Sequence, residues 1–351
     1  MSLPPQAPPA VDSVTIQQFG GLRNTITAER LEPGDFETAE NIDLDDAGQV
    51  HRRRGYTLVS AGNYHSVFET RRAVFGVKNT ALGIINPNYT FTSLLSGVGS
   101  EPLAYVQVGD NVYFSSPLTS GVIAEDGTVS AWGAVVDAGQ WISPVVNPTD
   151  TLGAIRGRQL GAPPMASALA YLNGRIYLAH DRDVWATELY LYTLVDKTRN
   201  FLRFEADITV LGAVSDGLYV GTQDAVWFLG GAFREMKRIQ VSQYGALPGS
   251  LVYVPAGMVS PEMVRTANGE SPDAVLFMTS SGLIAGLDSG VTRNLTQDRM
   301  LFPDARSVAA LFRRQDGVNQ YIGVVDSGGT PQTAARIGDY VDAEIRRFQG
   351  A

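Results

Sequence analysis

Short apolar runs separated by polar turns dominate this chain, and they predict β-strands rather than helices. Each repeated unit begins with an apolar or aromatic strand core, continues through a polar turn and returns in a second apolar run. The clearest cores contain Val112, Ile176, Leu218 and Leu276. We expect these four segments to be inner or middle strands of different sheets.

The repeated units indicate a particular β architecture. A four-stranded propeller blade occupies about 40–50 residues, so a chain of 351 residues has room for about six or seven. A β-sandwich, whose hairpins also alternate apolar strands with glycine turns, is the alternative. We favour an all-β, β-propeller-like fold with a short N-terminal arm and a few short helices.

Helical periodicity is confined to three short segments, residues 27–31, 32–40 and 339–348. In the last of these, a helix would place one group of apolar side chains on a single face. That group consists of Tyr340, Val341, Ile345 and Phe348.

The proline-rich residues 1–20 predict an extended arm, and residues 21–351 predict the propeller domain. The glycine-rich region around 121–164 predicts an insertion or linker, to which Trp132 and Trp141 would belong. Trp185 and Trp227 fall instead in predicted strands, where we expect them to pack between sheets.

The composition and motifs of the chain argue against several classes of function. The net charge of −9 is opposite to that of a typical nucleic-acid-binding protein, and the absence of cysteine excludes disulfides and thiol chemistry. No apolar stretch approaches the ~20 residues that a membrane-spanning helix needs. The three histidines lack ligand spacing, and no nucleophile or phosphate-loop motif is present. We therefore predict no catalytic residue, no metal and no cofactor.

The segment 41–56 combines acidic and basic residues. Asp43, Asp45 and Asp46 precede Gly48 and suggest a calcium loop, but Ala47 and Arg54 occupy positions that require oxygen ligands. Turn residues between short apolar runs favour a hairpin with a polar tip. Its basic strand, containing Arg52, Arg53 and Arg54, requires acidic partners or solvent.

Residues 17–56 also resemble the opening of tail proteins from short-tailed bacteriophages, the tail nozzle group or tail tubular protein B. A glycine-containing strand, a proline turn, an acidic residue before asparagine and a hairpin ending in arginine-glycine carry the resemblance. The matching residues are Gly20, Gly21, Pro33, Glu40, Asn41, Gly48, Arg54 and Gly55. The segment 216–231 and the sequence downstream to Thr296 are similar to this group as well.

The resemblance implies a virion structural protein without catalytic activity. Its members are β-propeller subunits of a homo-oligomeric ring, expected to have six subunits, that extends the DNA ejection channel below the portal and adaptor. Expected partners are the adaptor, tail fibre or spike proteins, and double-stranded DNA in transit. Such a protein is made in the host cytoplasm and functions in the virion tail, where Arg52, Arg53 and Arg54 would contact a neighbouring subunit or the channel. A receptor-binding or glycan-processing propeller of a phage tail or bacterial surface is the alternative.

Overall fold

The computed structural model describes residues 16, 18–39, 42–44, 48–52, 57–133, 160–255, 273–296, 299–315 and 318–327. Across these residues the fold is all-β, and the helices are the single 3-10 turns η1 (Ala28–Arg30) and η2 (Asp288–Gly290). No helix in this part of the chain has the length and hydrophobicity needed to cross a membrane.

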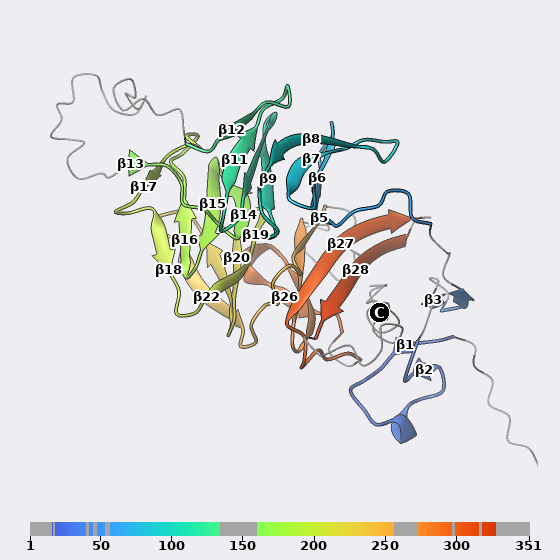
Figure 1. The fold of residues 1–351 in the computed structure, drawn as a ribbon. Coiled ribbons are helices and arrows are strands. Elements are labelled where there is room, and N and C mark those ends of the chain that lie inside the picture. The colour runs from blue at the N-terminus through green and yellow to red at the C-terminus, as the bar shows by residue number, and fades with distance from the viewer. Residues whose placement is uncertain are drawn as a thin grey trace, which may run out of the picture.

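Five antiparallel four-stranded sheets form the body of the molecule (Figure 1). Sheet 1 contains β5 (Tyr64–Glu69), β6 (Val74–Lys78), β7 (Ala81–Ile85) and β8 (Phe91–Ser96). Sheet 2 contains β9 (Ala104–Val108), β10 (Asn111–Ser115), β11 (Ser120–Ile123) and β12 (Val129–Ala131). Sheet 3 contains β14 (Ala168–Leu172), β15 (Arg175–His180), β16 (Asp183–Ala186) and β18 (Phe201–Arg203). Sheet 4 contains β19 (Ile208–Val214), β20 (Gly217–Thr222), β21 (Val226–Gly230) and β22 (Lys237–Ser242). Sheet 5 contains β23 (Val252–Val254), β24 (Ala274–Thr279), β25 (Gly282–Gly286) and β26 (Thr292–Asn294).

Four smaller sheets complete the described structure. Sheet 6 is a long hairpin of β27 (Ser307–Gln315) and β28 (Val318–Asp326). A short parallel pair joins β1 (Gly21–Leu22) to β2 (Asp35–Phe36), and an antiparallel pair joins β3 (Ile42–Leu44) to β4 (Val50–Arg52). We call the described residues from 18 to 52 the N-terminal unit. The last pair is β13 (Leu160–Gly161) with β17 (Val195–Asp196).

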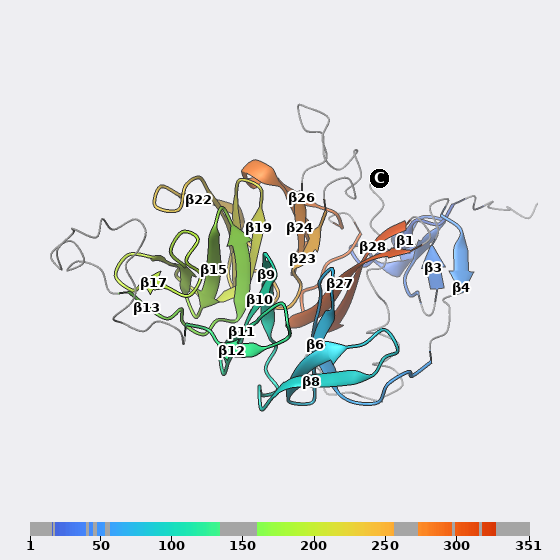
Figure 2. The same cartoon turned by 90° about the horizontal axis from the view of Figure 1, so that it is seen from above.

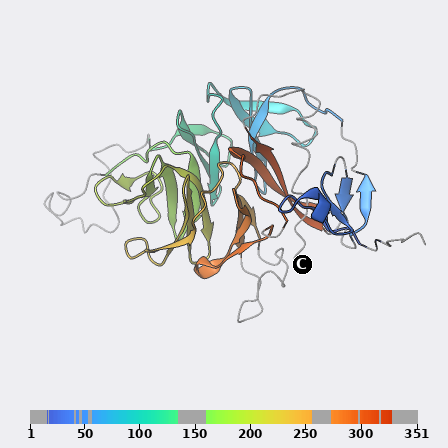
Figure 3. The ribbon, with the colours of Figure 1, turned by 90° about the horizontal axis from the view of Figure 1, so that it is seen from below.

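The larger sheets follow one another side by side in chain order, as the succession of colours shows (Figures 2 and 3). The first strands of successive sheets are neighbours: β9 contacts β14, β14 contacts β19, and β23 contacts β27. Sheets of antiparallel strands stacked in this order give the β-propeller-like fold that the sequence predicts.

The predicted strand cores are confirmed in detail. Val112, Ile176, Leu218 and Leu276 lie in β10, β15, β20 and β24, and each of these is an inner strand, second from one edge, of a different sheet. This position explains their continuous apolar sequences, because side chains alternate between two sheet faces and both faces are buried. In β20, Leu218 and Val220 pack toward sheet 3 while Tyr219 packs toward sheet 5.

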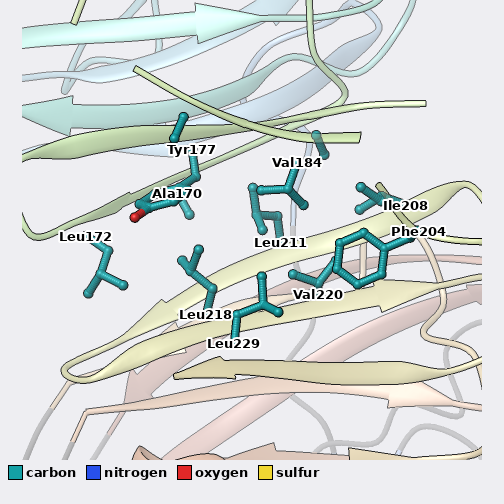
Figure 4. Close-up of a cluster of buried hydrophobic side chains, with 12 residues drawn as sticks. Ala170, Leu172, Tyr177, Val184, Phe204, Ile208, Leu211, Leu218, Val220 and Leu229 are labelled. Atoms are coloured by element: carbon teal, nitrogen blue, oxygen red, sulfur yellow. The ribbon is translucent and has the colours of Figure 1, made fainter. Parts of the chain in front are cut away.

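Buried aliphatic and aromatic side chains fill the spaces between neighbouring sheets. The core between sheets 3 and 4 shows the arrangement, with Tyr177 and Leu172 facing Leu218 and Leu229 (Figure 4). Burying each such side chain contributes about 1.5–3 kcal/mol, so inter-sheet packing is the main source of stability.

Two expectations about local structure are wrong. Residues 32–40 contain β2 rather than a helix, because Gly34 adopts a φ of +104° that interrupts helical geometry, and Phe36 stacks on Phe19 with ring centroids 5.2 Å apart. Trp132 directly follows β12 and is buried against Tyr113, so it belongs to the core rather than to an insertion.

Other expectations have mixed outcomes. Segment 27–31 contains η1, and Trp185 and Trp227 lie in β16 and β21 as predicted. Segment 339–348 lies outside the described residues, as do residues 1–15 of the expected arm and Trp141. Within the region around 121–164, residues up to 131 complete β11 and β12, and 134–159 are not described. The insertion or linker there stays a prediction.

Candidate functional site

The arginine-rich segment forms the hairpin that its turn residues predict. Strand β3 pairs antiparallel with β4, with Leu44 opposite Val50 and Ile42 opposite Arg52. Gly48 lies in the turn with a φ of +71°, a conformation that favours glycine. The Arg52 side chain is exposed at the end of β4.

Most of the charged residues next to Arg52 lie in parts of the segment that the structure does not describe. Arg53 and Arg54 lie outside the described residues, as do Asp45 and Asp46, and only the backbone of Asp43 is described. Among the side chains that the structure does describe, no cluster of three or more histidine, aspartate or glutamate residues could hold a metal. The contact of Arg52, Arg53 and Arg54 with a neighbouring subunit or with the DNA channel stays a prediction.

A buried carboxylate fixes the N-terminal unit to the rest of the molecule. Asp35 in β2 accepts a hydrogen bond from Arg23 at 3.1 Å and another from Arg299 at 2.9 Å. The Asp35 side chain is only 5% exposed, whereas those of Arg23 and Arg299 are 22% and 44% exposed. One desolvated anion therefore joins a cation of its own unit to a cation that follows sheet 5.

The pKa of Asp35 reflects this environment. Burial raises the pKa, but hydrogen bonds and Coulombic attraction from Arg23 and Arg299 outweigh burial and lower it below its ordinary value. The carboxylate is therefore charged at neutral pH, when both contacts are strongest.

Backbone and amide groups reinforce the same junction. The Asn24 side chain donates to the carbonyl of Leu301 at 2.8 Å and accepts from its amide at 2.9 Å. The backbone N–H of Asn24 donates to the backbone carbonyl of Arg299 at 2.8 Å. The two contacts between Asn24 and Leu301 join positions 277 residues apart in sequence, and no local sequence signal indicates them.

Packing or backbone conformation in this unit explains why glycine occupies three of the positions that carry the resemblance to tail proteins. A Cβ atom on Gly20 would lie 2.7 Å from the guanidinium of Arg299, and one on Gly48 would lie 2.2 Å from the side chain of Gln18. Gly21 has a φ of +91°. Pro33 is exposed beside Gly34, while Glu40, Asn41, Arg54 and Gly55 lie outside the described residues.

A groove of about 710 Å³ between sheets 4 and 5 is a second candidate site. The described side chains that line it are uncharged and include Gln240, Ser242, Tyr244, Thr292 and Asn294. Several of these polar groups bond within the protein. The Ser242 hydroxyl donates to the Tyr244 carbonyl at 3.0 Å, and the Asn294 amide donates to the Ser281 carbonyl at 2.8 Å.

Comparison with known proteins bears on the fold alone. Neither family models nor curated proteins give a match. Among solved structures, the extracellular domain of a protein described as a one-component system of B. thetaiotaomicron is 11% identical over 82% of this chain and 33% of its own length, with a TM-score of 0.46. This chain thus spans about a third of that protein. The N-terminal domain of Nup159 is 8% identical over 75% of this chain and 73% of its own, with a TM-score of 0.43. The WD40 domain of Neurospora crassa Pan2 is 10% identical over 76% of this chain and 72% of its own, with a TM-score of 0.45.

Proposed function

We propose that this chain is a virion structural protein, a subunit of a ring-forming tail nozzle of a short-tailed bacteriophage. The ring, of six subunits, extends the DNA ejection channel below the portal and adaptor and contacts tail fibre or spike proteins. The protein is made in the host cytoplasm and functions in the virion tail. The sequence resemblance in residues 17–56 and 216–296 supports this proposal, together with the all-β fold.

The N-terminal unit is the observation that carries the proposal. Gly20, Gly21 and Gly48 of the resemblance occupy positions where packing or backbone conformation favours glycine. The pattern therefore encodes a defined appendage, which Asp35 fixes to the chain after sheet 5. The hairpin β3–β4 belongs to this appendage and exposes Arg52.

Such an appendage suits ring assembly. Closed rings require two different surfaces on each subunit, one binding the other on the next copy. An appended hairpin with the exposed cationic side chain of Arg52 supplies one surface, and an acidic propeller supplies the other, since the chain carries a net charge of −9.

Negative-stain electron microscopy and mass photometry of the purified protein test the proposal. We expect rings with an open axis and a mass close to six times 37.7 kDa. Arg52→Glu should weaken the ring, whereas Arg71→Glu makes the same charge change at another exposed position and should leave it intact. A protein that stays monomeric at the concentration of the assay, alone and with its adaptor, contradicts the proposal.

DNA binding provides an independent test. A conduit must not hold a sliding polyanion, and each cation that neutralises a phosphate strengthens binding through counterion release. We expect no measurable binding of a fluorescent DNA duplex at physiological salt. Tight, strongly salt-dependent binding that Arg52→Glu reduces would identify the hairpin as a DNA clamp instead.

Exposed aromatic residues favour a second candidate, a receptor-binding or glycan-processing propeller. Tyr171 and Tyr190 are 37% and 68% exposed, and the Tyr171 ring meets Tyr192 edge-on at 6.1 Å. Amphipathic aromatic side chains of this kind are common at binding surfaces. A monomer or trimer that binds purified bacterial surface polysaccharide, and loses binding in Tyr190→Ala, would favour this candidate.

A further inference from the structure

The N-terminal unit lies at the periphery of the molecule, beside sheet 6 (Figures 2 and 3). Its described contacts with the propeller are the polar ones at residues 299–301, where Asp35 binds Arg299 and Asn24 binds Arg299 and Leu301. None of the five hydrophobic clusters among the described residues contains a residue of this unit. The unit therefore docks on the propeller without sharing its apolar core.

The connection between the unit and the propeller is long. Strand β4 ends at Arg52 and β5 begins at Tyr64, so 11 residues, 53 to 63, join them. The structure describes residues 57–63 of this connection, which contain no helix or strand. Eleven extended residues span up to about 36–40 Å. The connection therefore allows the unit to reach beyond the edge of its own propeller.

The docking contacts do not require that the unit and the propeller belong to the same copy. The partners of Asp35 and Asn24 lie in residues 299–301, and an identical neighbouring copy presents the same atoms in the same geometry. In chain order the unit precedes sheet 1, whereas these partners follow sheet 5. The two halves of the junction are therefore different surfaces, as the head-to-tail contact of a closed ring requires.

We propose that neighbouring copies of this chain exchange their N-terminal units, so that Asp35 of one copy binds Arg299 of the next. Each copy donates its own unit and receives the unit of another copy. The inference rests on the proposed ring and names the contact that joins its subunits. In a single copy the same residues close on each other, as the structure shows.

Exchange preserves the native junction and covers exposed apolar surface. The buried carboxylate of Asp35 keeps both of its cationic partners, since Arg23 moves with the unit and the neighbour supplies Arg299. Leu58 and Val59 in the connection are 84% and 61% exposed in a single copy. A neighbouring propeller packed alongside the connection removes these side chains from water, which favours the exchanged form.

Disulfide trapping tests the proposal, because the natural chain contains no cysteine. Asn24→Cys combined with Leu301→Cys leaves Asp35 and Arg299 in place. Mild oxidation of the assembled protein should link each chain to the next and give a ladder of covalent oligomers on non-reducing electrophoresis.

Asp216→Cys combined with Ser289→Cys is the matched control. The Asp216 carboxylate accepts a hydrogen bond from the backbone N–H of Ser289 at 2.9 Å, between sheets 4 and 5, which share a closed apolar core. Its disulfide should therefore stay within one chain. A double variant at Asn24 and Leu301 that gives only intramolecular disulfides, or none, overturns the proposal.

Mixed chains give a second measurement that does not depend on the double variant. Chains carrying only Asn24→Cys are dissociated, mixed with chains carrying only Leu301→Cys, and reassembled before oxidation. We expect disulfides between the two kinds of chain to form at least tenfold faster than in the corresponding mixture of Asp216→Cys and Ser289→Cys chains. Equal rates in the two mixtures overturn the proposal.

Electron microscopy of the same samples separates this inference from the proposed function. Rings that contain only intramolecular disulfides overturn exchange and leave the nozzle proposal intact. Disulfides between chains in dimers, without rings, support exchange and contradict the nozzle proposal. Monomers with intramolecular disulfides contradict both.

Discussion

Removing the charge of Asp35 should release the N-terminal unit without unfolding the propeller. Asp35→Asn keeps the volume of the side chain but replaces one acceptor oxygen with an amide, so at least one guanidinium loses its charged partner. Hydrogen bonds to charged groups contribute about 1.5–3 kcal/mol each. Arg23 and Arg299 are 22% and 44% exposed, so water compensates them in part. We therefore expect a loss of about 2 kcal/mol, which corresponds to a roughly 30-fold increase in the opening equilibrium of the unit.

Hydrogen exchange of peptides covering residues 18–39 and 299–301 measures this opening directly. Asp207→Asn is the matched control, because Asp207 pairs with Arg182 at 3.0 Å while both side chains are more than half exposed. Exposed pairs contribute only about 0–1 kcal/mol. The reasoning fails if the two variants change exchange by the same factor, or if Asp35→Asn lowers protection uniformly across all sheets.

Acid should reproduce the Asp35 variant in the natural protein. The folded pKa of Asp35 lies below its ordinary value of ~3.9, so its stabilising contribution is complete above that pH. The contribution is lost as pH falls through the lowered pKa of the folded state. Protection of the N-terminal unit should therefore decrease below about pH 4 in the natural protein and show a weaker pH dependence in Asp35→Asn.

Three further predictions concern packing, hydrogen bonding and metal. Gly249→Ala should lower the free energy of unfolding, measured by thermal melting, by more than about 2 kcal/mol, because the added Cβ would lie 2.1 Å from the Val308 carbonyl oxygen and disturb the docking of sheet 6. Gly97→Ala is the control, because Gly97 has the same φ of +76° but no atom lies within 4 Å of the added Cβ. It should lower the free energy of unfolding by only about 1 kcal/mol. Tyr219→Phe should cost about 1–2 kcal/mol in urea unfolding, because its buried hydroxyl donates to the carbonyls of Leu287 and Val291; an unchanged midpoint and slope would contradict this. Titration with calcium should release no saturable heat and chelation should leave the melting temperature unchanged, whereas a micromolar site at Asp43, Asp45 and Asp46 would refute the prediction that this segment binds no metal.

Local pattern was sufficient to identify one inner strand in each of four sheets. Segments such as those around Leu218 and Leu276 are apolar on both faces and bounded by turn residues, and this signal survives in the sequence alone. The pattern failed at residues 32–40, where tertiary contacts of Asp35 and the stacking of Phe36 on Phe19 determine a short strand. Helix propensity is a weak preference that such contacts override.

The junction between the N-terminal unit and sheet 5 could not be predicted from the sequence. Asp35 and Arg299 are ordinary surface-type residues separated by 264 positions, and nothing near either one marks it as buried or paired. The sequence instead drew attention to Arg52, Arg53 and Arg54, of which only Arg52 is described. A long-range ion pair needs either coordinates or covariation between related sequences.

The same junction fixes an order of events during synthesis. The ribosome produces about 5–20 residues per second, so Asp35 waits roughly 10–50 seconds before Arg299 is made. Sheets 1 to 5 can form by local pairing of consecutive strands in that time, because their contacts are close in sequence. Asp35 therefore leaves the ribosome long before its contact with Arg299 can form, and until then that side of its carboxylate is available to another cation, including one on a neighbouring nascent chain.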